Sequence, residues 1–196
     1  MVYTKNSIED ITKWLKIHLN EERYLHSIGT ADCAKNLALK FNLDCDKAYI
    51  AGLLHDCAKC FPKDELFDIV NNKIDILDCE RISNKTLHAP VSAYIASTEF
   101  RVEDKEILSS IRWHTLGKLS MSNFEKIIFL ADKIEPNTRT GDYCTCIRAI
   151  LNNEMNLDKA LLQCYKFTII SLVDRNLKIC PLTIDIYNEL QTLLNE

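Results

Sequence analysis

Helical spacing of apolar residues, rarely interrupted by glycine or proline, is the feature that most constrains how this chain folds. Only four glycines and four prolines occur in 196 residues. Apolar residues recur at three- and four-residue spacing almost throughout, as on the buried face of a helix. No pair of segments shows the alternation expected of paired strands. We therefore predict an all-α fold, with residues 1–196 forming a single domain and no linker.

Several predicted helices carry clear start or stop signals. Ser7 and Asp44 are favourable N-cap residues, Ser122 and Glu125 form a capping box, and Pro136 ends the helix that follows this box. A less certain helical segment covers Asp75 to Ser83. The other predicted helices start at Ile8 or cover Glu21–Phe41, Asp44 to about Cys60, Lys63–Asn72, Leu87–Glu99 with Pro90 in its first turn, Glu103–His114, Tyr143–Asn152, Leu157–Leu177 and Ile184–Leu194.

Composition and charge exclude several classes of protein. The net charge is -4 and no long basic run occurs, which argues against a nucleic-acid-binding surface. No segment approaches the roughly 18–20 apolar residues of a membrane span, and the first residues lack the apolar core of a signal peptide. We therefore expect a cytoplasmic protein that neither enters a membrane nor binds nucleic acid. The nine cysteines, an odd number, are expected to be free thiols.

The segment Ala51–Phe61, "AGLLHDCAKCF", places three charged or titratable residues, His55, Asp56 and Lys59, after an apolar run. Charged groups are costly to bury unless they are paired or bind metal. Cys57-x-x-Cys60 resembles half of a zinc site, but no second half with suitable spacing follows. The segment therefore favours a buried polar site over a plain core helix.

Other histidines and one aspartate lie in similar apolar settings elsewhere in the chain. Each of them alone is more often a core residue with a satisfied hydrogen bond than a ligand. Together, imidazole and carboxylate groups bind transition metals, and six of them are too many for one structural zinc. They suit a site for two metals with open positions for water and phosphate. The predicted metal ligands are His26, His55, Asp56, His88, His114 and Asp132, whereas His18 fits no such pattern and is expected to be structural.

The order and surroundings of these residues resemble the HD-domain metal-dependent phosphohydrolases. That superfamily has a histidine, a His-Asp pair and a distant aspartate, which His26, His55-Asp56 and Asp132 match in order. His88 and His114 correspond to the extra histidines of its two-metal members. The segment "HTLGKLSMSNFEKIIFLADKIEPNTRTG" resembles the YqeK-type subgroup more narrowly, and the likeness runs from about residue 23 to residue 148. The C-terminal helices are expected to pack on this core.

The resemblance implies a function and a set of roles. The subgroup cleaves diadenosine tetraphosphate symmetrically to two ADP with a di-iron centre, and manganese or another divalent metal is an alternative. Asp56 would bridge two metal ions, which would activate a water so that hydroxide attacks the second phosphorus and ADP leaves. Asp56, Lys59 and Arg139 are the predicted catalytic residues. Substrate contacts are expected from Arg23, His26, Lys59, His88, His114, Thr115, Asp132, Arg139, Asp174 and Arg175.

The chain also departs from the subgroup pattern and leaves alternatives open. Lys133 stands where an aromatic residue is usual, and Thr138 and Thr140 flank Arg139 where bulkier residues are common. One alternative is another HD-type phosphohydrolase, whose substrate would be a nucleoside monophosphate or a guanosine signalling nucleotide. From a different class, a non-catalytic nucleotide or metal sensor would use the same ligands, and a homodimer is compatible with the sequence.

Overall fold

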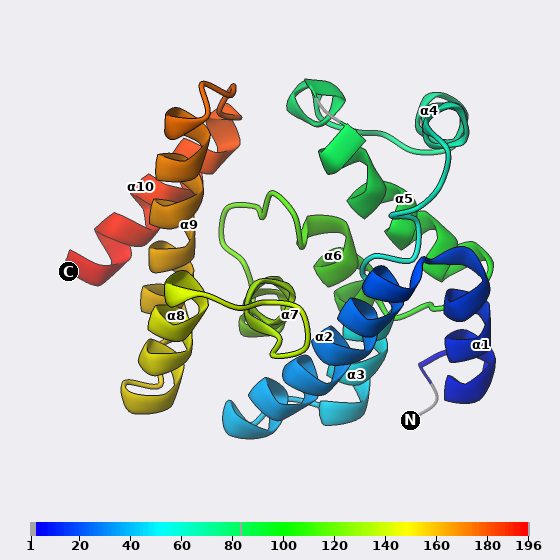
Figure 1. Cartoon of the computed structure of the whole chain (residues 1–196), viewed down its shortest axis with the longest axis horizontal. Helices are drawn as coiled ribbons and strands as arrows, with labels where there is room; N and C mark the ends of the chain where they lie inside the picture. Colours follow the sequence, from blue (N-terminus) through cyan, green and yellow to red (C-terminus); the bar gives the residue numbers. More distant parts are fainter. Residues whose placement is uncertain (1–2, 83, 196) are drawn as a thin grey trace.

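The computed structural model describes residues 3–82 and 84–195, and within these ranges the chain is helical with no strand (Figure 1). The all-α prediction is therefore confirmed. The elements are α1 (Ile8–His18), α2 (Glu21–Lys40), α3 (Cys45–Leu54), α4 (Lys63–Asn72), the short 3-10 helix η1 (Asp78–Ile82), α5 (Asn84–Thr98), α6 (Lys105–Trp113), α7 (Asn123–Ile134), α8 (Asp142–Asn153), α9 (Leu157–Asp174) and α10 (Pro181–Asn195).

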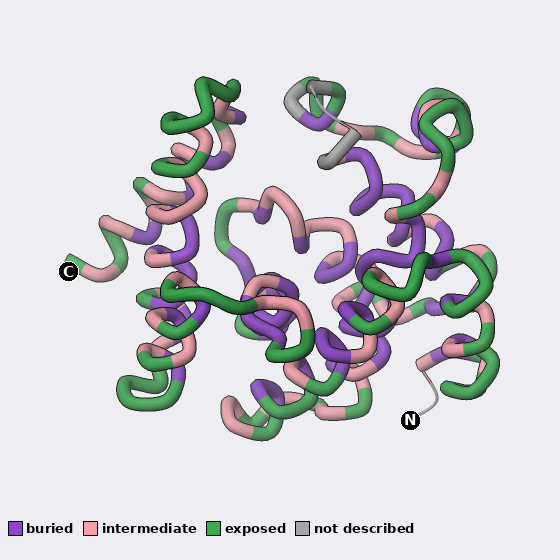
Figure 2. Tube along the Cα trace, viewed as in Figure 1, coloured by how far each residue is buried: buried purple, intermediate pink, exposed green. Residues whose placement is uncertain are grey.

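Helix α7 lies at the centre of the molecule. It packs against α2, α3, α6, α8 and α9, and Figure 1 shows it end-on between the other helices. Because partners surround α7, nine of its 12 residues are buried, which explains why the run "IIFLA" is apolar on every face. Its start is the expected capping box of Ser122 and Glu125. Figure 2 shows buried positions gathered on α7, on α5 and on the inner turns of α2 and α3.

Helices α2 and α3 form a closely packed hairpin. Their approach depends on Gly52, because a β-carbon there would lie 2.7 Å from the Ala31 Cα and 2.9 Å from its backbone nitrogen. The same β-carbon would lie 2.9 Å from the carbonyl oxygen of Thr30, and both Thr30 and Ala31 are buried. This close packing brings the part of α2 that carries His26 next to the end of α3.

Helix α3 ends at Leu54 and not near Cys60, so the prediction of one continuous helix was wrong. Residues 55–60 form tight turns, in which the backbone nitrogens of Cys57 and Lys59 donate to the carbonyls of Leu54 and Asp56. Neighbouring residues of an α-helix point about 100° apart, because a turn takes 3.6 residues. The tighter turns let His55 and Asp56 face the same centre.

Smaller differences from the predicted boundaries also have physical causes. Helix α5 begins three residues earlier than expected, so Pro90 lies inside it and not in its first turn. Helix α9 ends at Asp174 because Asn176 adopts a left-handed conformation, with φ of 53°, which stops the helix. Helix α10 begins at Pro181, since proline suits the first turn of a helix. The segment after Asp75 forms only η1, and Ser83 lies outside the described residues.

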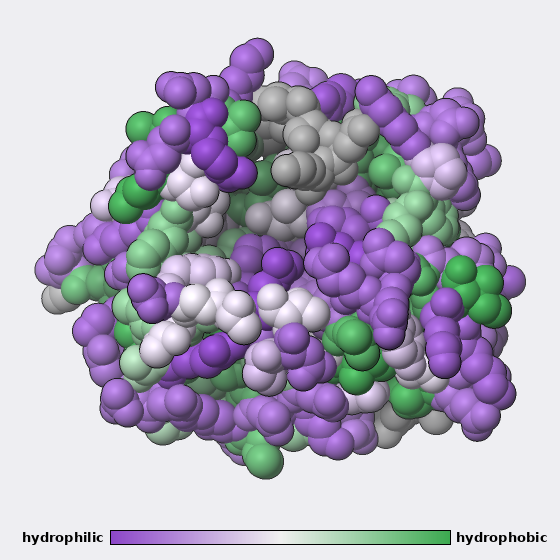
Figure 3. All heavy atoms as spheres, in the orientation of Figure 1, coloured by the Kyte–Doolittle hydropathy of each residue, from purple (hydrophilic) through white to green (hydrophobic). Residues whose placement is uncertain are grey.

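The C-terminal helices form a separate wall of the molecule. Helices α8, α9 and α10 lie together along the left side of Figure 1, where α9 packs on α7, α8 and α10. The space-filling view in Figure 3 shows this face hollowed between that wall and the side of the molecule that carries α5.

No helix within the described ranges is both long and apolar enough to cross a membrane. The eight cysteines whose side chains the structure describes are free thiols. Cys57 is buried whereas Cys60 is exposed, so these two do not face one metal.

Gly52→Ala is expected to lower the free energy of unfolding by about 3 kcal/mol, because the added methyl group would overlap backbone atoms that cannot rotate away. Urea denaturation followed by circular dichroism measures this change. Adding Ala31→Gly should not rescue the variant, since the overlap is with the backbone of Ala31 and not with its side chain. A Gly52→Ala protein as stable as the wild type would contradict this view of the hairpin.

Candidate metal centre and substrate cleft

The six predicted metal ligands meet in the interior, although they come from five different places in the chain. Two of them, His55 and Asp56, lie in the turn after α3. All six are buried, with 5% exposure or less. The others are His26 on α2, His88 on α5, His114 at the end of α6 and Asp132 on α7.

The Asp56 carboxylate lies between two groups of histidines. Its Oδ1 is 3.0 Å from His88 Nε2 and 3.4 Å from His114 Nε2. Its Oδ2 is 3.8 Å from His55 Nε2 and 3.9 Å from His26 Nε2. Asp56 Oδ1 is buried and accepts no hydrogen bond. A buried carboxylate oxygen without a donor is costly, so this atom points to a cationic ligand.

Backbone carbonyls fix the tautomers of two histidines. The Nδ1 of His55 lies 2.7 Å from the carbonyl oxygen of Gly52, and the Nδ1 of His114 lies 2.7 Å from that of Ile111. A carbonyl oxygen only accepts hydrogen bonds, so each Nδ1 carries the proton and each neutral ring presents a bare Nε2. This is the arrangement by which proteins prepare histidine for metal binding.

Glu135 performs the same task for His26. The His26 Nδ1 lies 3.0 Å from Glu135 Oε1, so this nitrogen donates and the Nε2 faces Asp132 Oδ1 at 2.9 Å. Glu135 is itself held by the backbone nitrogens of Asn137, at 2.6 Å, and Thr138, at 2.9 Å. Burial alone would raise the pKa of Glu135, but the hydrogen bonds from the Thr138 hydroxyl, from His26 and from the Asn137 backbone nitrogen hold it below its usual value.

The ligand atoms form two overlapping sets, and within each set all atoms lie within 4.8 Å of one another. The first set is His26, His55 and Asp132, and the second is His55, Asp56 and His114. The Nε2 atoms of His26 and His55 face each other at 3.3 Å. Each ring carries its proton on Nδ1, so both Nε2 atoms present lone pairs. Such lone pairs repel each other unless they share a cation, so the donor set fits metal ions.

The pKa shifts of His114 and of the two carboxylates agree with this role. Burial lowers the pKa of His114 to about 3, so its ring is neutral near pH 7. Burial alone would raise the pKa of Asp56, but the neighbouring rings of His55 and His88 hold it well below its usual range. Burial would also raise the pKa of Asp132, but the charge of Lys133 and the hydrogen bond from His26 hold this pKa well below its usual range. Neutral imidazoles and ionised carboxylates are the forms that bind metal. At His55, burial lowers the pKa, but the neighbouring Asp56 and Asp132 raise it above its usual value, so a metal ion would compete with a proton there.

Basic side chains border this cluster of ligands. An Arg23 guanidinium nitrogen is 3.7 Å from Asp56 Oδ2, and Lys59 Nζ is 3.6 Å from Asp56 Oδ1. Arg139 reaches Asp132 Oδ1 at 3.2 Å, and the ammonium of Lys133 pairs with Asp132 Oδ2. Four cations beside the two buried carboxylates Asp56 and Asp132 create local positive potential, which favours anionic ligands.

Two adjoining hollows open beside the basic side chains. A polar cleft of about 550 Å³ is lined by Lys59, Asp132, Arg139 and others. A neighbouring cavity of about 500 Å³ is more apolar and includes Leu116 and Phe129 in its lining. The cleft and the cavity share three lining residues, Thr115, Lys133 and Arg175, so they meet at these side chains.

The remaining predicted site residues are not all placed alike. Thr115 Oγ1 lies 3.2 Å from His88 Nε2 and 3.1 Å from His114 Nε2. Arg175 is exposed but lines both hollows, whereas Asp174 is exposed and lines neither of them. His18 is exposed and stacks on Trp14, with 3.7 Å between the ring centroids.

Three residues at the site were not predicted to act there: Lys133, Glu135 and Thr138. Lys133 was noted only as a departure from the subgroup, yet it lies between the two hollows. Thr138 lies 3.2 Å from His26 Nδ1 and donates to Glu135. The Glu135-Pro136 pair marked the place in the sequence, but nothing in its spacing indicated that Glu135 would contact His26.

A protein-family model described as HD domain matches residues 23–137. The chain belongs to the HD-domain family. The symmetrical bis(5'-nucleosyl)-tetraphosphatase of Halalkalibacterium halodurans is 38% identical to it over 90% of this chain and 92% of that protein. The protein of the same name from Bacillus subtilis is 36% identical over 92% of this chain and 95% of its own length.

A solved structure resembles the fold of this HD-domain protein closely. It is the crystal structure of a predicted HD superfamily hydrolase involved in NAD metabolism from Clostridium acetobutylicum. The TM-score is 0.88 at 36% sequence identity, and the match covers 95% of this chain and 98% of the other. The family match and the donor set agree that this HD-domain protein binds divalent metal.

Glu135→Gln is expected to weaken Mn²⁺ binding by about 10- to 100-fold, the usual effect of losing a group that orients a ligand. At either oxygen position the amide nitrogen would face an N–H donor, that of Asn137 at one position and those of Thr138 and His26 at the other, so the group could no longer hold His26 in the same orientation. Titration calorimetry or competition with a chelating dye measures the affinity.

Glu125→Gln is the matched control, because Glu125 is also a buried carboxylate, lies near the start of α7, and pairs with Lys118 and Ser109 and not with a metal ligand. It should lose stability while keeping the wild-type affinity for Mn²⁺. Equal losses of affinity in the two variants would show that Glu135 has no special role.

Proposed function

We propose that this protein is a metal-dependent phosphohydrolase that cleaves diadenosine tetraphosphate symmetrically into two molecules of ADP. The observation that supports this most directly is the buried Asp56 carboxylate, whose two oxygens face two separate groups of histidine nitrogens. The relatives from Halalkalibacterium halodurans and Bacillus subtilis are named for the same activity.

We propose further that the site holds two metal ions, with iron the leading candidate and manganese the alternative. His26, His55 and Asp132 would hold one ion, and His88 and His114 the other. Asp56 would contribute one oxygen to each, since Oδ1 faces the second group and Oδ2 the first. Bound metal ions supply Lewis acidity, which acidifies a water molecule and stabilises negative charge on phosphate oxygens.

The reaction adds one water to the middle of the tetraphosphate chain. The water oxygen bonds to the second phosphorus, and the bond from that phosphorus to the oxygen that links it to the third phosphorus breaks. That linking oxygen leaves with the second ADP, so two identical products account for all atoms. Arg23, Lys59 and Arg139 border the ligands and would neutralise charge on the phosphates as it develops.

The two hollows suit the two kinds of group in such a substrate. The polyphosphate belongs in the polar cleft, where Lys59, Lys133, Arg139 and Arg175 supply positive charge. A nucleoside fits the adjoining apolar cavity, in which Phe129 and Tyr165 stack with 5.4 Å between ring centroids. Aromatic and aliphatic walls with a few polar groups are typical of cavities that bind organic ligands.

The purified protein, loaded with Fe²⁺ or Mn²⁺, is expected to convert diadenosine tetraphosphate to ADP alone, as separated by anion-exchange chromatography. His114→Gln should reduce kcat by more than about 100-fold, as expected when a metal ligand that sets up the reaction is lost. His18→Gln is the matched control and should retain activity, because His18 is exposed and away from the centre. AMP with ATP as products would overturn the symmetric cleavage, and no turnover by metal-loaded protein would favour another phosphorylated substrate or a sensor.

Leu172→Trp should raise the KM for diadenosine tetraphosphate by about tenfold, equivalent to roughly 1.4 kcal/mol of binding, because the indole would fill the apolar cavity that Leu172 lines. Steady-state kinetics measures it. Ile170→Trp is the control on the same helix, since Ile170 is 57% exposed and does not line the cavity. Equal KM values for the two variants would show that the nucleoside does not bind in the apolar cavity.

A further inference from the structure

We propose that Arg148, on α8, is a positioning residue for the metal centre, although it touches none of the ligands. The proposal concerns the segment 135–139, called here the post-α7 loop, which joins α7 to the start of the C-terminal wall. The catalytic part of this inference rests on the function proposed above, whereas its metal-binding part does not.

Arg148 holds both ends of the post-α7 loop. Its Nε donates to the carbonyl oxygen of Ile134 at 2.9 Å, and one terminal nitrogen donates to the same oxygen at 2.6 Å. That terminal nitrogen also donates to the carbonyl oxygens of Glu135, at 3.3 Å, and Arg139, at 2.8 Å. One guanidinium therefore ties the last residue of α7 to both the first and the last residue of the loop.

The loop carries two groups that act directly on the ligands. At one end, Glu135 accepts the hydrogen bond from His26 Nδ1. At the other, Arg139 donates to the backbone carbonyl of Asp132 at 2.9 Å and to its carboxylate at 3.2 Å. Because Arg148 fixes the backbone of both residues, it sets the orientation of His26 and the approach of Arg139 to the cleft.

Arg148 does more than cap a helix. The free carbonyls at the end of any helix favour a nearby cation, and a lysine or water would satisfy them. A planar guanidinium differs because its fixed fork reaches several acceptors at once. Here the Nε and one terminal nitrogen together reach the carbonyls of the adjacent residues Ile134 and Glu135 and that of Arg139, which the shorter side chain of lysine, with its single nitrogen, would reach less fully.

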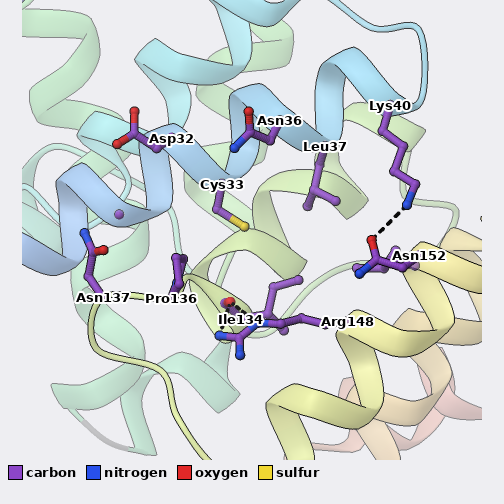
Figure 4. A pocket seen from close by; sticks show the side chains of 12 residues that line it. Asp32, Cys33, Asn36, Leu37, Lys40, Ile134, Pro136, Asn137, Arg148 and Asn152 are labelled. Atoms are coloured by element: carbon purple, nitrogen blue, oxygen red, sulfur yellow. Dashed lines mark hydrogen bonds between the residues drawn. The ribbon is translucent and has the colours of Figure 1, made fainter.

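The back of the loop is closely packed and borders a cavity. A β-carbon on Gly29 would lie 2.3 Å from Glu135 Oε2, so α2 leaves Glu135 little room to move. Beside this contact, a cavity of about 350 Å³ is lined by Arg148, Leu37, Lys40 and neighbouring residues (Figure 4). Lys40 lies at another part of the same cavity, where it points away from Pro136 and Asn137 and donates to Asn152 at 2.9 Å.

The test compares Arg148→Ala, Arg148→Lys and wild type in Mn²⁺ affinity and in the kcat and KM for diadenosine tetraphosphate. Arg148→Ala is expected to lose about 10- to 100-fold in Mn²⁺ affinity and in kcat. Arg148→Lys should recover little of this, because one ammonium cannot replace the fork. Millimolar methylguanidinium, which the cavity can admit after truncation, should restore both quantities in Arg148→Ala at least partly, whereas methylammonium should not.

Lys40→Met is the matched control, since it removes a cation from the same cavity without touching the post-α7 loop. It should keep wild-type affinity and kinetics and show no response to methylguanidinium. If Arg148→Ala does not fold, Arg148→Gln, which retains most of the side-chain volume, enters the same comparison.

Wild-type affinity in the folded Arg148 variants would overturn the proposal, and so would a loss that methylguanidinium does not restore. The metal titration needs no substrate, so it separates this proposal from the proposed function. If the wild type failed to cleave diadenosine tetraphosphate while the Arg148 variants lost and regained Mn²⁺ affinity, only the proposed substrate would be wrong.

Discussion

The buried carboxylate of Asp56 imposes the constraint on which the rest of the site depends. Its two oxygens are surrounded by imidazole nitrogens, and one of the oxygens has no hydrogen-bond donor. A negative charge in the interior requires positive charge at the same place. The structure can supply positive charge in two ways. One is a cation held by the histidine and carboxylate ligands, and the other is the lysine and arginine side chains that line the cleft.

Much of this arrangement could be predicted from local sequence signals. Caps at Ser7, Asp44 and Ser122 marked helices that the structure contains, because capping depends on residues only a few positions apart. The meeting of His26, His55-Asp56 and Asp132 was expected from their resemblance to a known motif. Spacing alone could not show it, since these residues are joined through tertiary packing.

Where prediction was incomplete, the cause was tertiary contact. The helical pattern continued past Leu54, yet the chain forms turns there, and the backbone nitrogen of Ala58 donates to Ser92 Oγ on α5 at 3.1 Å. Lys59 therefore lies near the site because of these turns and not because of a continuous helix. The Glu135-Pro136 pair marked Glu135 without indicating its role, because its partner His26 is 109 positions away. Arg148 has no sequence signature, because its role depends on how α8 packs beside the loop.

The pairing of His26 with Asp132 also matters for the stability of the whole molecule. These residues are 106 positions apart in the chain, yet their ligand atoms are separated by 2.9 Å. A cation shared by them, as proposed above, would act as a reversible crosslink that closes a very long loop, and closing such a loop restricts the unfolded chain strongly. Because the unfolded chain cannot offer the same ligands together, every increment of metal binding adds to folding stability. The concentration of available metal would therefore control the stability of the folded protein as well as its rate of turnover.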